Sequence, residues 1–451
     1  MNNIHTLTCS NRKYLFNGLQ VEVEIESNPY QLPISQLFLM AGRINKKRSF
    51  LFVSKLLGKH IPINPVKGLV VGAILADRYA KVVKGENLGL DMMLKDALSA
   101  EVPPSFRSPF ISEHTNPIII GFAETATGLG HSFYECFKSA DFFHTTREEM
   151  LSLTPVISFE EEHSHATSHR CYVDNLLLQN NREIILVDDE LTTGKTAINI
   201  IRSLHLKFPR KTYTVVSILD WRTIEHRKAF ASLEAELGIT IHCVSLLKGR
   251  IKVSGDLLLD NTNEATYFET RTKQTLTVVP IYKKYPSPFS TIPVDVASDI
   301  PYPYLYETGR FGLHSKDNQK IDEWLQMLAS FLKAQRTGGK TLCLGTGEFM
   351  YLPMKLATLM GNGVSYQSTT RSPIFAESDP EYGVNWKVEF ANPENLQLTN
   401  YVYNIPPQAY DDLYLFFERE VSSENLQPLL SALEKTGITD IKIIFFSGRG
   451  E

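Results

Sequence analysis

Short apolar runs alternate with amphipathic segments through most of the chain. In the first half, runs typical of buried strands lie at residues 118–120, 142–146, 184–187 and 212–219. Patterns with a helical period lie at residues 34–57, 69–83, 126–138 and 197–206. Strands and helices that alternate at these lengths predict an α/β fold, a mostly parallel sheet with helices on both faces.

The same rhythm returns after a different middle segment. Residues 249–303 hold two short strand patterns and a run of prolines, which indicates a β-rich connector and linker. Beyond it, helix patterns alternate with strand patterns at 341–344, 364–368, 413–417 and 441–446. We therefore predict a first domain over residues 1–248, the connector over 249–303, and a second α/β domain over 304–451.

Composition narrows the classes of partner. A chain of 451 residues is too long to fold around a single hydrophobic core, so we expect more than one domain. Its net charge of -4 shows no excess of basic residues that would favour nucleic acid or a membrane surface. Phosphate ligands stay allowed, because backbone N–H groups can bind them. The five cysteines are scattered, and no apolar run suits a membrane span or a signal peptide. We expect a cytoplasmic protein that binds neither nucleic acid nor membranes.

The most informative segment runs from Ile184 to Thr196. Its four apolar residues predict a strand that ends in Asp188 and Asp189, and a short turn rich in threonine and glycine opens a helix. Parallel strands of α/β folds bind ligands at their carboxyl ends. There, two adjacent carboxylates can accept hydrogen bonds from two sugar hydroxyls, and the turn can direct backbone N–H groups at a phosphate.

Two other structures contain parts of this segment. An N-capped helix after a buried strand accounts for a Thr or Asp at the cap, but not for two acids followed by Thr-Gly-x-Thr. Gly194-Lys195-Thr196 also looks like the end of a P-loop. That loop needs glycine five residues before Gly194, where this chain has Asp189, so the P-loop interpretation fails.

The segment resembles the signature of type I phosphoribosyltransferases for 5-phosphoribosyl 1-diphosphate (PRPP). That signature is an apolar strand, Asp-Asp, three variable residues, Thr-Gly, any residue and Thr, and every position matches. The resemblance implies the type I fold, with the two acids on the ribose hydroxyls and in catalysis. It implies that PRPP is bound by Asp188, Asp189, Glu190, Leu191, Thr192, Thr193, Gly194, Lys195 and Thr196.

A second loop follows the strand at residues 118–120. The segment from Gly121 to Gly128 leaves that strand and opens a helix. In type I enzymes the corresponding loop binds pyrophosphate through backbone groups, so the resemblance implies this role for Ala123, Glu124 and Thr125. A simple helix N-terminus is the alternative for this loop.

A polar stretch lies between the two loops. Type I enzymes place a mobile catalytic loop here, which closes over PRPP and supplies cations to the leaving pyrophosphate. Arg147, His163 and His165 are therefore expected to act in catalysis. The family usually has Lys or Arg at the loop tip, so the histidines depart from its pattern. Two alternatives stay open: a metal site that includes His169, and a solvated loop without chemistry.

The resemblance narrows to one subgroup. Residues Thr370-Arg371-Ser372-Pro373 match the motif that gives the TRSP domain its name. This domain lies C-terminal in phosphoribosyltransferases encoded near bacterial tellurium-resistance and stress genes, and the resemblance spans nearly the whole chain. It implies an orotate-phosphoribosyltransferase-like activity in the synthesis or salvage of a nucleoside-like metabolite, with the base left unsettled.

The two α/β halves share an internal pattern. Gly121, Glu124 and residues 145–147 recur at identical offsets as Gly345, Glu348 and residues 369–371. We interpret the second half as a degenerate copy of the same fold that has lost the PRPP loop. Glu348, Thr370 and Arg371 are then expected to line a second anion site, since arginine suits phosphate recognition. A helix cap with a buried salt bridge is the alternative.

These features predict transfer of 5-phosphoribosyl from PRPP to a nitrogenous base, with release of pyrophosphate. We expect Mg²⁺ as the cofactor, bound through PRPP rather than by a dedicated set of side chains. PRPP and a small base are the expected partners, and the resemblance implies a homodimer. The alternatives are a regulator that binds PRPP or a nucleotide without turnover, and a scaffold of a stress-response assembly.

Overall fold

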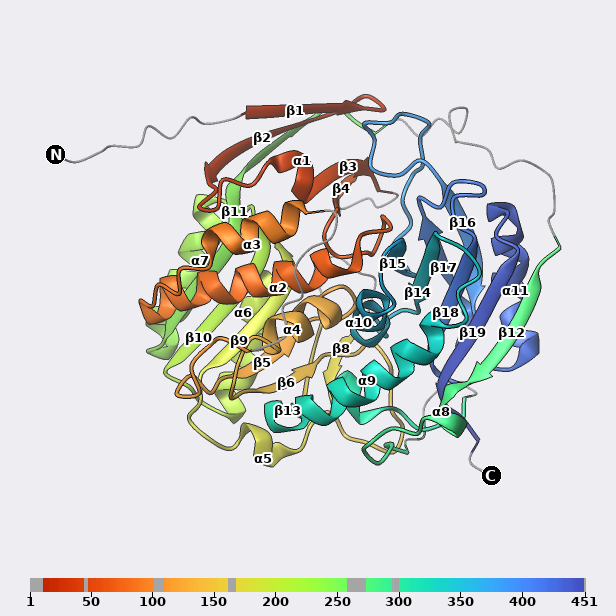
Figure 1. Cartoon of the computed structure of the whole chain (residues 1–451). Helices are drawn as coiled ribbons and strands as arrows, with labels where there is room; N and C mark the ends of the chain where they lie inside the picture. Colours follow the sequence, from red (N-terminus) through yellow and green to blue (C-terminus); the bar gives the residue numbers. More distant parts are fainter. Residues whose placement is uncertain are drawn as a thin grey trace.

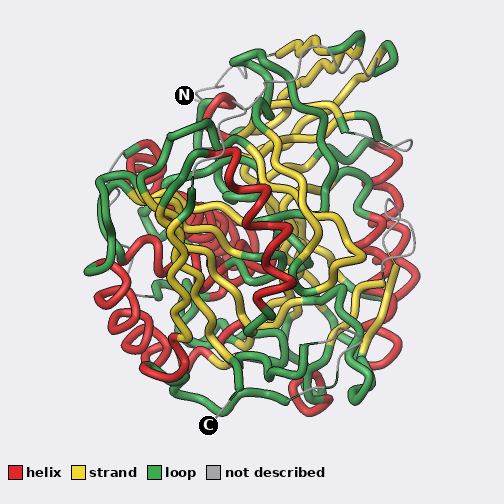
Figure 2. Tube along the Cα trace, turned by 90° about the vertical axis from the view of Figure 1, so that its right-hand side faces the viewer, coloured by secondary structure: helices red, strands yellow, loops and turns green. Residues whose placement is uncertain are grey.

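The computed structural model describes residues 11–43, 48–100, 109–160, 168–257, 273–293, 295 and 300–449. Two large sheets lie on the left and right of Figure 1, one in each half of the chain. In Figure 2 the strands run through the interior and helices lie along both sides. None of the helices in these ranges combines the length and the apolar character that crossing a membrane requires.

The first sheet is built from strands of the N-terminal half. They are β1 (Asn11–Phe16), β2 (Leu19–Ser27), β5 (Ile118–Gly121), β6 (Asp141–His144), β9 (Ile184–Leu191), β10 (Thr212–Asp220), β11 (Thr240–Ser254) and β13 (Leu313–His314), in the order β1-β2-β11-β10-β9-β5-β6-β13. The five strands from β11 to β6 are parallel, and antiparallel strands close both edges. The central strands are buried on both faces, as helical cover requires.

Helices cover this sheet. They are α2 (Pro65–Tyr79), continued by a π-helical segment η1 (Ala80–Lys84), and α3 (Asp91–Ser99), α4 (Ala126–Tyr134), α5 (Asn175–Leu178), α6 (Lys195–Lys207) and α7 (Ile224–Leu237). The predicted helix over residues 34–57 is wrong. A short helix α1 (Ile34–Leu37) leads into the antiparallel pair β3 (Phe38–Gly42) and β4 (Phe50–Ser54). Four consecutive buried residues in β4 pack as a strand, which aromatic and β-branched side chains favour.

The second sheet is entirely parallel. Its order is β12 (Thr275–Pro280), β19 (Asp440–Ser447), β18 (Asp412–Arg419), β14 (Thr341–Gly345) and β15 (Val364–Ser368). A separate hairpin is formed by β16 (Lys387–Asn392) and β17 (Asn395–Tyr403). The helical segments are α8 (Ile281–Lys284), η3 (Tyr306–Thr308), η4 (Ser315–Asp317), α9 (Asn318–Lys333), α10 (Tyr351–Leu359), α11 (Ser423–Leu433) and η5 (Glu434–Thr436).

Strands cross both of the predicted domain limits. β11 continues six residues past residue 248, to Ser254. β12 comes from the predicted connector but forms an edge of the second sheet, and β13 comes from the predicted second domain but pairs with β6 of the first sheet. The two halves are therefore interlocked, and the limits 1–248, 249–303 and 304–451 stay predictions.

The second half repeats the topology of the first. The first half has the order β5, α4, β6, an antiparallel pair of β7 (Ile157–Glu160) and β8 (Ser168–Cys171), the short helix α5, β9, α6 and β10. Apart from the short helices α5 and η5, the second half has the same order: β14, α10, β15, the β16–β17 hairpin, β18, α11 and β19. The strand order β6-β5-β9-β10 thus corresponds to β15-β14-β18-β19. The two loops that carry Glu124 and Glu348 leave equivalent strands, as the internal repeat predicts.

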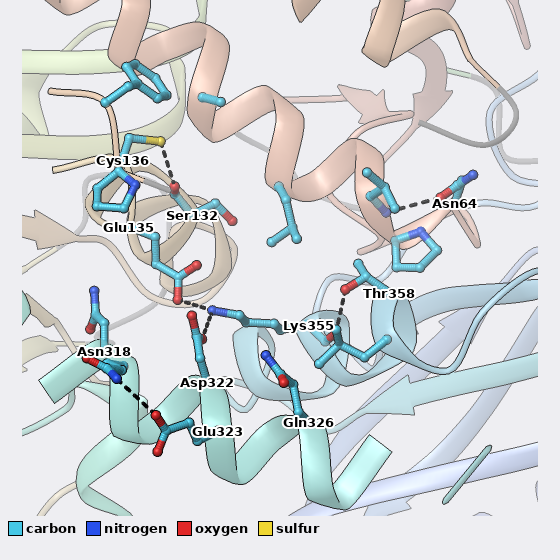
Figure 3. Close-up of a pocket in the computed structure, with 18 of the residues that line it drawn as sticks. Asn64, Ser132, Glu135, Cys136, Asn318, Asp322, Glu323, Gln326, Lys355 and Thr358 are labelled. Carbon is cyan, nitrogen blue, oxygen red and sulfur yellow. Dashed lines mark hydrogen bonds and ion pairs between the residues drawn. The ribbon is translucent and has the colours of Figure 1, made fainter. Parts of the chain in front are cut away.

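Helices of both halves meet between the two sheets. In Figure 1, α2 and α4 of the first half lie against α10 of the second. Figure 3 shows Lys355 of α10 reaching Glu135 beside α4 and Asp322 of α9, at a pocket of about 860 Å³ between the halves. Burial alone would lower the pKa of Lys355, but the two carboxylates outweigh it and raise this pKa, so the lysine stays charged.

Glu307 in η3 makes folding depend on pH. Its carboxyl is buried and accepts a hydrogen bond from Ser287, and burial raises its pKa from 4.5 to about 7. The folded state therefore holds this proton more tightly. The resulting stability is fully present below pH 4.5 and is lost as the pH rises through 7.

Replacement of this carboxyl by a neutral amide tests the assignment. Glu307→Gln is expected to raise the free energy of unfolding at pH 8 by about 1–3 kcal/mol relative to the wild type. At pH 4, below the carboxyl pKa of 4.5 in the unfolded chain, the difference should nearly vanish. Urea unfolding at both pH values measures this, and a shift of equal size at both would show that Glu307 does not titrate as described.

Candidate active site

A pocket of about 360 Å³ lies where β5 and β9 end. It brings together segments that are far apart in the sequence. The lining residues are Arg43, Arg48, Leu51, Phe52, Lys59, His60, Phe122, Ala123, Glu124, Thr125, Arg147, Asp188, Asp189, Glu190, Leu191, Thr192, Thr193, Gly194, Thr196, Ala197, Arg371 and Ser372. Both loops expected to bind parts of PRPP therefore face one cavity.

Most of the predicted site residues line this pocket. All of the predicted PRPP loop does so except Lys195, which begins α6 beside it. Ala123, Glu124 and Thr125 lie in the lining together with Arg147. His163 and His165 fall outside the described residues, so their role stays a prediction.

The PRPP loop is a strand, a turn and a helix. β9 continues past the predicted 184–187 through both acids to Leu191, and the Asp189 N–H donates to Asp188 Oδ1 at 2.9 Å. Gly194 has a φ of 74° and precedes α6, where the Lys195 N–H donates to Thr193 Oγ1 at 3.2 Å. The N-terminal end of α6, which carries a partial positive charge, therefore adjoins the pocket.

Gly194 is required by the backbone conformation and the close packing of the turn. A Cβ at this position would meet Phe230 Cε2 at 2.5 Å, and its left-handed backbone already disfavours other residues. Gly194→Ala is expected to lower the free energy of unfolding by about 1–3 kcal/mol and to displace the turn. Gly238→Ala is the matched control, with a φ of 64° and no atom within 4 Å of the added Cβ. Equal losses in urea unfolding would show that contact with Phe230 does not matter.

The loop after β5 is held from both halves of the chain. The Ala123 N–H donates to Thr145 Oγ1 at 2.9 Å. Lys59 donates to Thr125 Oγ1 at 2.5 Å and lies 3.5 Å from Glu124 Oε2, which also accepts from Thr370 Oγ1 at 3.0 Å. This loop is therefore more than a helix N-terminus, because a lysine and a second-half threonine fix its carboxylate.

Charges of both signs face the pocket. Five cations, Arg43, Arg48, Lys59, Arg147 and Arg371, stand against four acids, Glu124, Asp188, Asp189 and Glu190. Arg48 pairs with Glu190 at 2.7 Å, although burial still raises the pKa of Glu190. Burial and the neighbouring cations lower the pKa of His60 well below its usual range, so its imidazole is neutral at pH 7. Such a lining suits a ligand with both hydroxyls and anionic groups.

Arg48, Lys59 and His60 were not among the predicted site residues. They flank β4: Arg48 lies just before it, in the stretch predicted as helix, and Lys59 and His60 lie after it. Arg48 stacks on Phe50 and Phe52, at 4.8 and 5.7 Å from the ring centroids. No local motif marks these residues, because only the fold of the β3–β4 pair brings them over the loops.

His169 is a packing residue. Its Nδ1 lies 2.9 Å from Thr145 Oγ1, and its ring stacks on Phe159 at 5.1 Å. It is buried and is not in the pocket lining. The part of the chain that the structure describes also holds no group of three His, Cys, Asp or Glu residues that could hold a metal ion.

The three residues expected to line a second anion site make different contacts in the structure. Arg371 lines the first pocket, and Thr370 donates to Glu124. Glu348 instead accepts from Thr146 Oγ1 at 2.6 Å and from the Arg147 N–H at 2.8 Å, and it pairs with Arg310. Burial opposes its ionisation, but Arg310 and these donors lower the pKa of Glu348 to about 2. Glu348 thus forms the buried salt bridge that was the alternative.

Two protein families match this chain. Residues 37–250 match the sequence model of a family described as phosphoribosyl transferase. Residues 307–433 match the TRSP domain, described as C-terminal to that phosphoribosyl transferase. The chain carries a phosphoribosyltransferase domain followed by a TRSP domain. No curated protein matches the chain.

The chain also has remote likenesses among solved structures. Adenine phosphoribosyl transferase from Trypanosoma brucei, in complex with AMP, pyrophosphate and ribose-5-phosphate, is 12% identical over 52% of this chain and 86% of its own, with a TM-score of 0.32. A hypothetical protein from Neisseria gonorrhoeae with bound ppGpp is 8% identical over 42% and 84%, with a TM-score of 0.24. Adenine phosphoribosyltransferase from Leishmania donovani is 17% identical over 37% and 68%, with a TM-score of 0.22. The family matches, and not these likenesses, carry the assignment.

Proposed function

We propose that this pocket binds PRPP and transfers its 5-phosphoribosyl group to a nitrogenous base, with release of pyrophosphate. The observation that carries the proposal is the meeting of the Asp188–Asp189 loop and the Glu124 loop across one cavity lined by five cations. One loop suits a sugar phosphate and the other a diphosphate, and PRPP has both groups on one ribose.

Each part of PRPP has a place in this arrangement. Asp188 and Asp189 accept hydrogen bonds from the two ribose hydroxyls, which are charge-assisted and therefore strong. The 5-phosphate lies on the turn from Thr192 to Thr196, whose N–H groups and helix end favour an anion. The diphosphate lies against Ala123, Glu124 and Thr125, beside Lys59.

The residues present fit Mg²⁺ bound through the ligand. Asp188 and Asp189 are adjacent carboxylates, and oxygen ligands of this kind suit Mg²⁺. These two residues would hold the ion together with the bound PRPP. When bound, Mg²⁺ neutralises charge on the departing diphosphate.

The transfer itself exchanges one bond at the anomeric carbon. The bond from this carbon to the diphosphate oxygen breaks, the bond to the base nitrogen forms, and the electron pair leaves with pyrophosphate. The sugar passes through a cation-like transition state, which the charges of Asp188 and Asp189 favour. Arg147 stabilises the leaving charge, and His163 and His165 are proposed to join it from the segment between β7 and β8.

The base contacts the apolar part of the lining. Leu51, Phe52 and Phe122 are apolar lining residues, and Phe52 stacks on Trp221 at 4.8 Å. A planar base can stack on such an aromatic ring. Arg48 offers a donor to an anionic base, which agrees with an orotate-like substrate. We extend the proposal to the synthesis or salvage of a nucleoside-like metabolite in a cytoplasmic tellurium-resistance or stress pathway, and to a homodimer.

A screen of bases tests the proposed reaction. The purified protein is incubated with PRPP, Mg²⁺ and each base, including orotate and the purines, and pyrophosphate release is measured. Release that depends on one base is the expected result. PRPP binding without release for any base would support the regulator, and absence of PRPP binding would support the scaffold.

A further inference from the structure

The TRSP motif reaches into the pocket of the other half. Arg371 and Ser372 of this motif line the pocket together with Glu124 and Thr125 of the first half. Arg371 is half-buried. Within the described ranges its guanidinium has neither a carboxylate nor a hydrogen-bond partner, whereas Arg48 and Lys59 are paired with acids of the pocket.

The geometry points to Arg371 as a ligand of the diphosphate group of PRPP, so that the C-terminal half completes the active site of the first half. This inference rests on the proposed function and adds a residue from the other half to it. A guanidinium can donate two parallel hydrogen bonds to a phosphate group, which suits the end of the pocket that holds the Glu124 loop.

The neighbouring residue fixes where Arg371 stands. Thr370 donates to Glu124 Oε2 at 3.0 Å, and its N–H donates to the Tyr401 carbonyl at 2.9 Å. Thr370 and Glu124 are both buried. The backbone that carries Arg371 is therefore tied directly to the loop proposed to bind pyrophosphate.

A corresponding hydrogen bond runs from the first half to the second, so the contact between the two halves is reciprocal. Thr146 of the first half donates to Glu348 of the second, as Thr370 of the second half donates to Glu124 of the first. Within each half the loops also correspond, since the Ala123 N–H donates to Thr145 and the Gly347 N–H to Thr369, at 2.9 and 3.0 Å. Each half thus places its Thr-Thr-Arg segment against the loop of the other.

The second half also holds other pocket residues in place. The Ser368 N–H donates to the Gly58 carbonyl at 2.7 Å, and Asn404 Nδ2 donates to the His60 carbonyl at 2.9 Å. Lys59 lies between these two contacts in the sequence. The second half therefore holds the backbone that carries Lys59 and His60, and it also supplies Arg371.

The corresponding place in the second half is filled by protein. Arg310 pairs there with Glu348 and lies 3.1 Å from Glu418, which stands in β18 at the position that Asp189 has in β9. Arg419 follows, buried against Glu148 at 3.5 Å and Glu394 at 3.6 Å. Among the described residues, internal cations therefore occupy this place in the second half, whereas the corresponding place in the first half is an open pocket to which both halves contribute.

Three ligands separate this inference from the proposed function. PRPP, pyrophosphate and ribose 5-phosphate are titrated into the full chain with Mg²⁺, for the wild type, Arg371→Ala, Arg371→Lys and Lys435→Ala. Lys435 is an exposed cation of the same half outside the pocket, so it serves as the matched control. The melting temperature of each variant is measured in parallel.

Arg371→Ala is expected to bind PRPP and pyrophosphate about 10- to 100-fold more weakly. Its affinity for ribose 5-phosphate and its melting temperature should stay at the wild-type values, and Arg371→Lys should recover part of the loss. Equal affinities of Arg371→Ala and the wild type for PRPP would overturn the inference and leave the proposed function standing. Failure of the wild type to bind PRPP would overturn both.

Discussion

Asp188→Asn/Asp189→Asn is expected to lose PRPP-dependent pyrophosphate release while it keeps the stability of the wild type. Each carboxylate accepts a charge-assisted hydrogen bond from a ribose hydroxyl, worth about 1.5–3 kcal/mol. Loss of both should reduce kcat/KM by roughly 10²- to 10⁴-fold. Asparagine keeps the volume of aspartate, and its Oδ1 can still accept the N–H of residue 189.

The stability of this variant separates a ligand-binding role from a structural one. Removal of two adjacent like charges relieves repulsion, so the melting temperature should stay level or rise. Asp96→Asn is the control, because Asp96 is exposed on α3 and lies outside the pocket. A parallel fall in melting temperature and turnover would show that the two acids serve folding instead.

The second large effect concerns Arg310, which joins the two halves. Its side chain is 2% exposed, and its guanidinium donates to Thr146 Oγ1 at 2.6 Å and pairs with Glu348 and Glu418. Arg310→Met leaves two buried carboxylates without their cation. Because a single removed partner leaves buried charge unpaired, we expect a loss of about 3–5 kcal/mol in the free energy of unfolding.

Two further variants make the Arg310 prediction specific. Arg202→Met removes an ion pair with Glu236 whose partners are 45% and 51% exposed, and should cost less than about 1 kcal/mol. Arg310→Met/Glu348→Gln/Glu418→Gln removes the stranded charges and should recover part of the stability. Urea unfolding at pH 7 measures all three. A triple variant no more stable than Arg310→Met would show that lost packing, and not unpaired charge, is the cause.

The local pattern of apolar and polar residues predicts the two loops of the pocket and most strands of the first sheet. The run from Ile184 to Thr196 contains its own strand, turn and helix start, so its structure follows from neighbouring residues. The matching offsets of Glu124 and Glu348 likewise indicated equivalent strands, which the sheet order confirms. In these places short-range geometry and the tertiary structure agree.

Long-range contacts explain what local pattern did not predict. The β3–β4 pair has apolar spacing that also fits a helix, and its burial against the rest of the chain decides for strand. The local pattern predicts a separate anion site for Arg371, because nothing in it indicates that the Thr-Thr-Arg segment of each half contacts the loop of the other half. β12 lies before the second domain in the sequence, in the predicted connector, but it pairs with β19 of the second sheet through a contact that local pattern cannot indicate.

The central claim is that this chain binds PRPP in the pocket between the Asp188–Asp189 loop and the Glu124 loop. The most direct test is isothermal titration of the purified chain with PRPP and Mg²⁺. We predict one site per chain with a Kd on the order of micromolar, and no detectable heat of binding for Asp188→Asn/Asp189→Asn. A well-folded wild type that shows no binding, or a double variant that binds as tightly as the wild type, would contradict the claim.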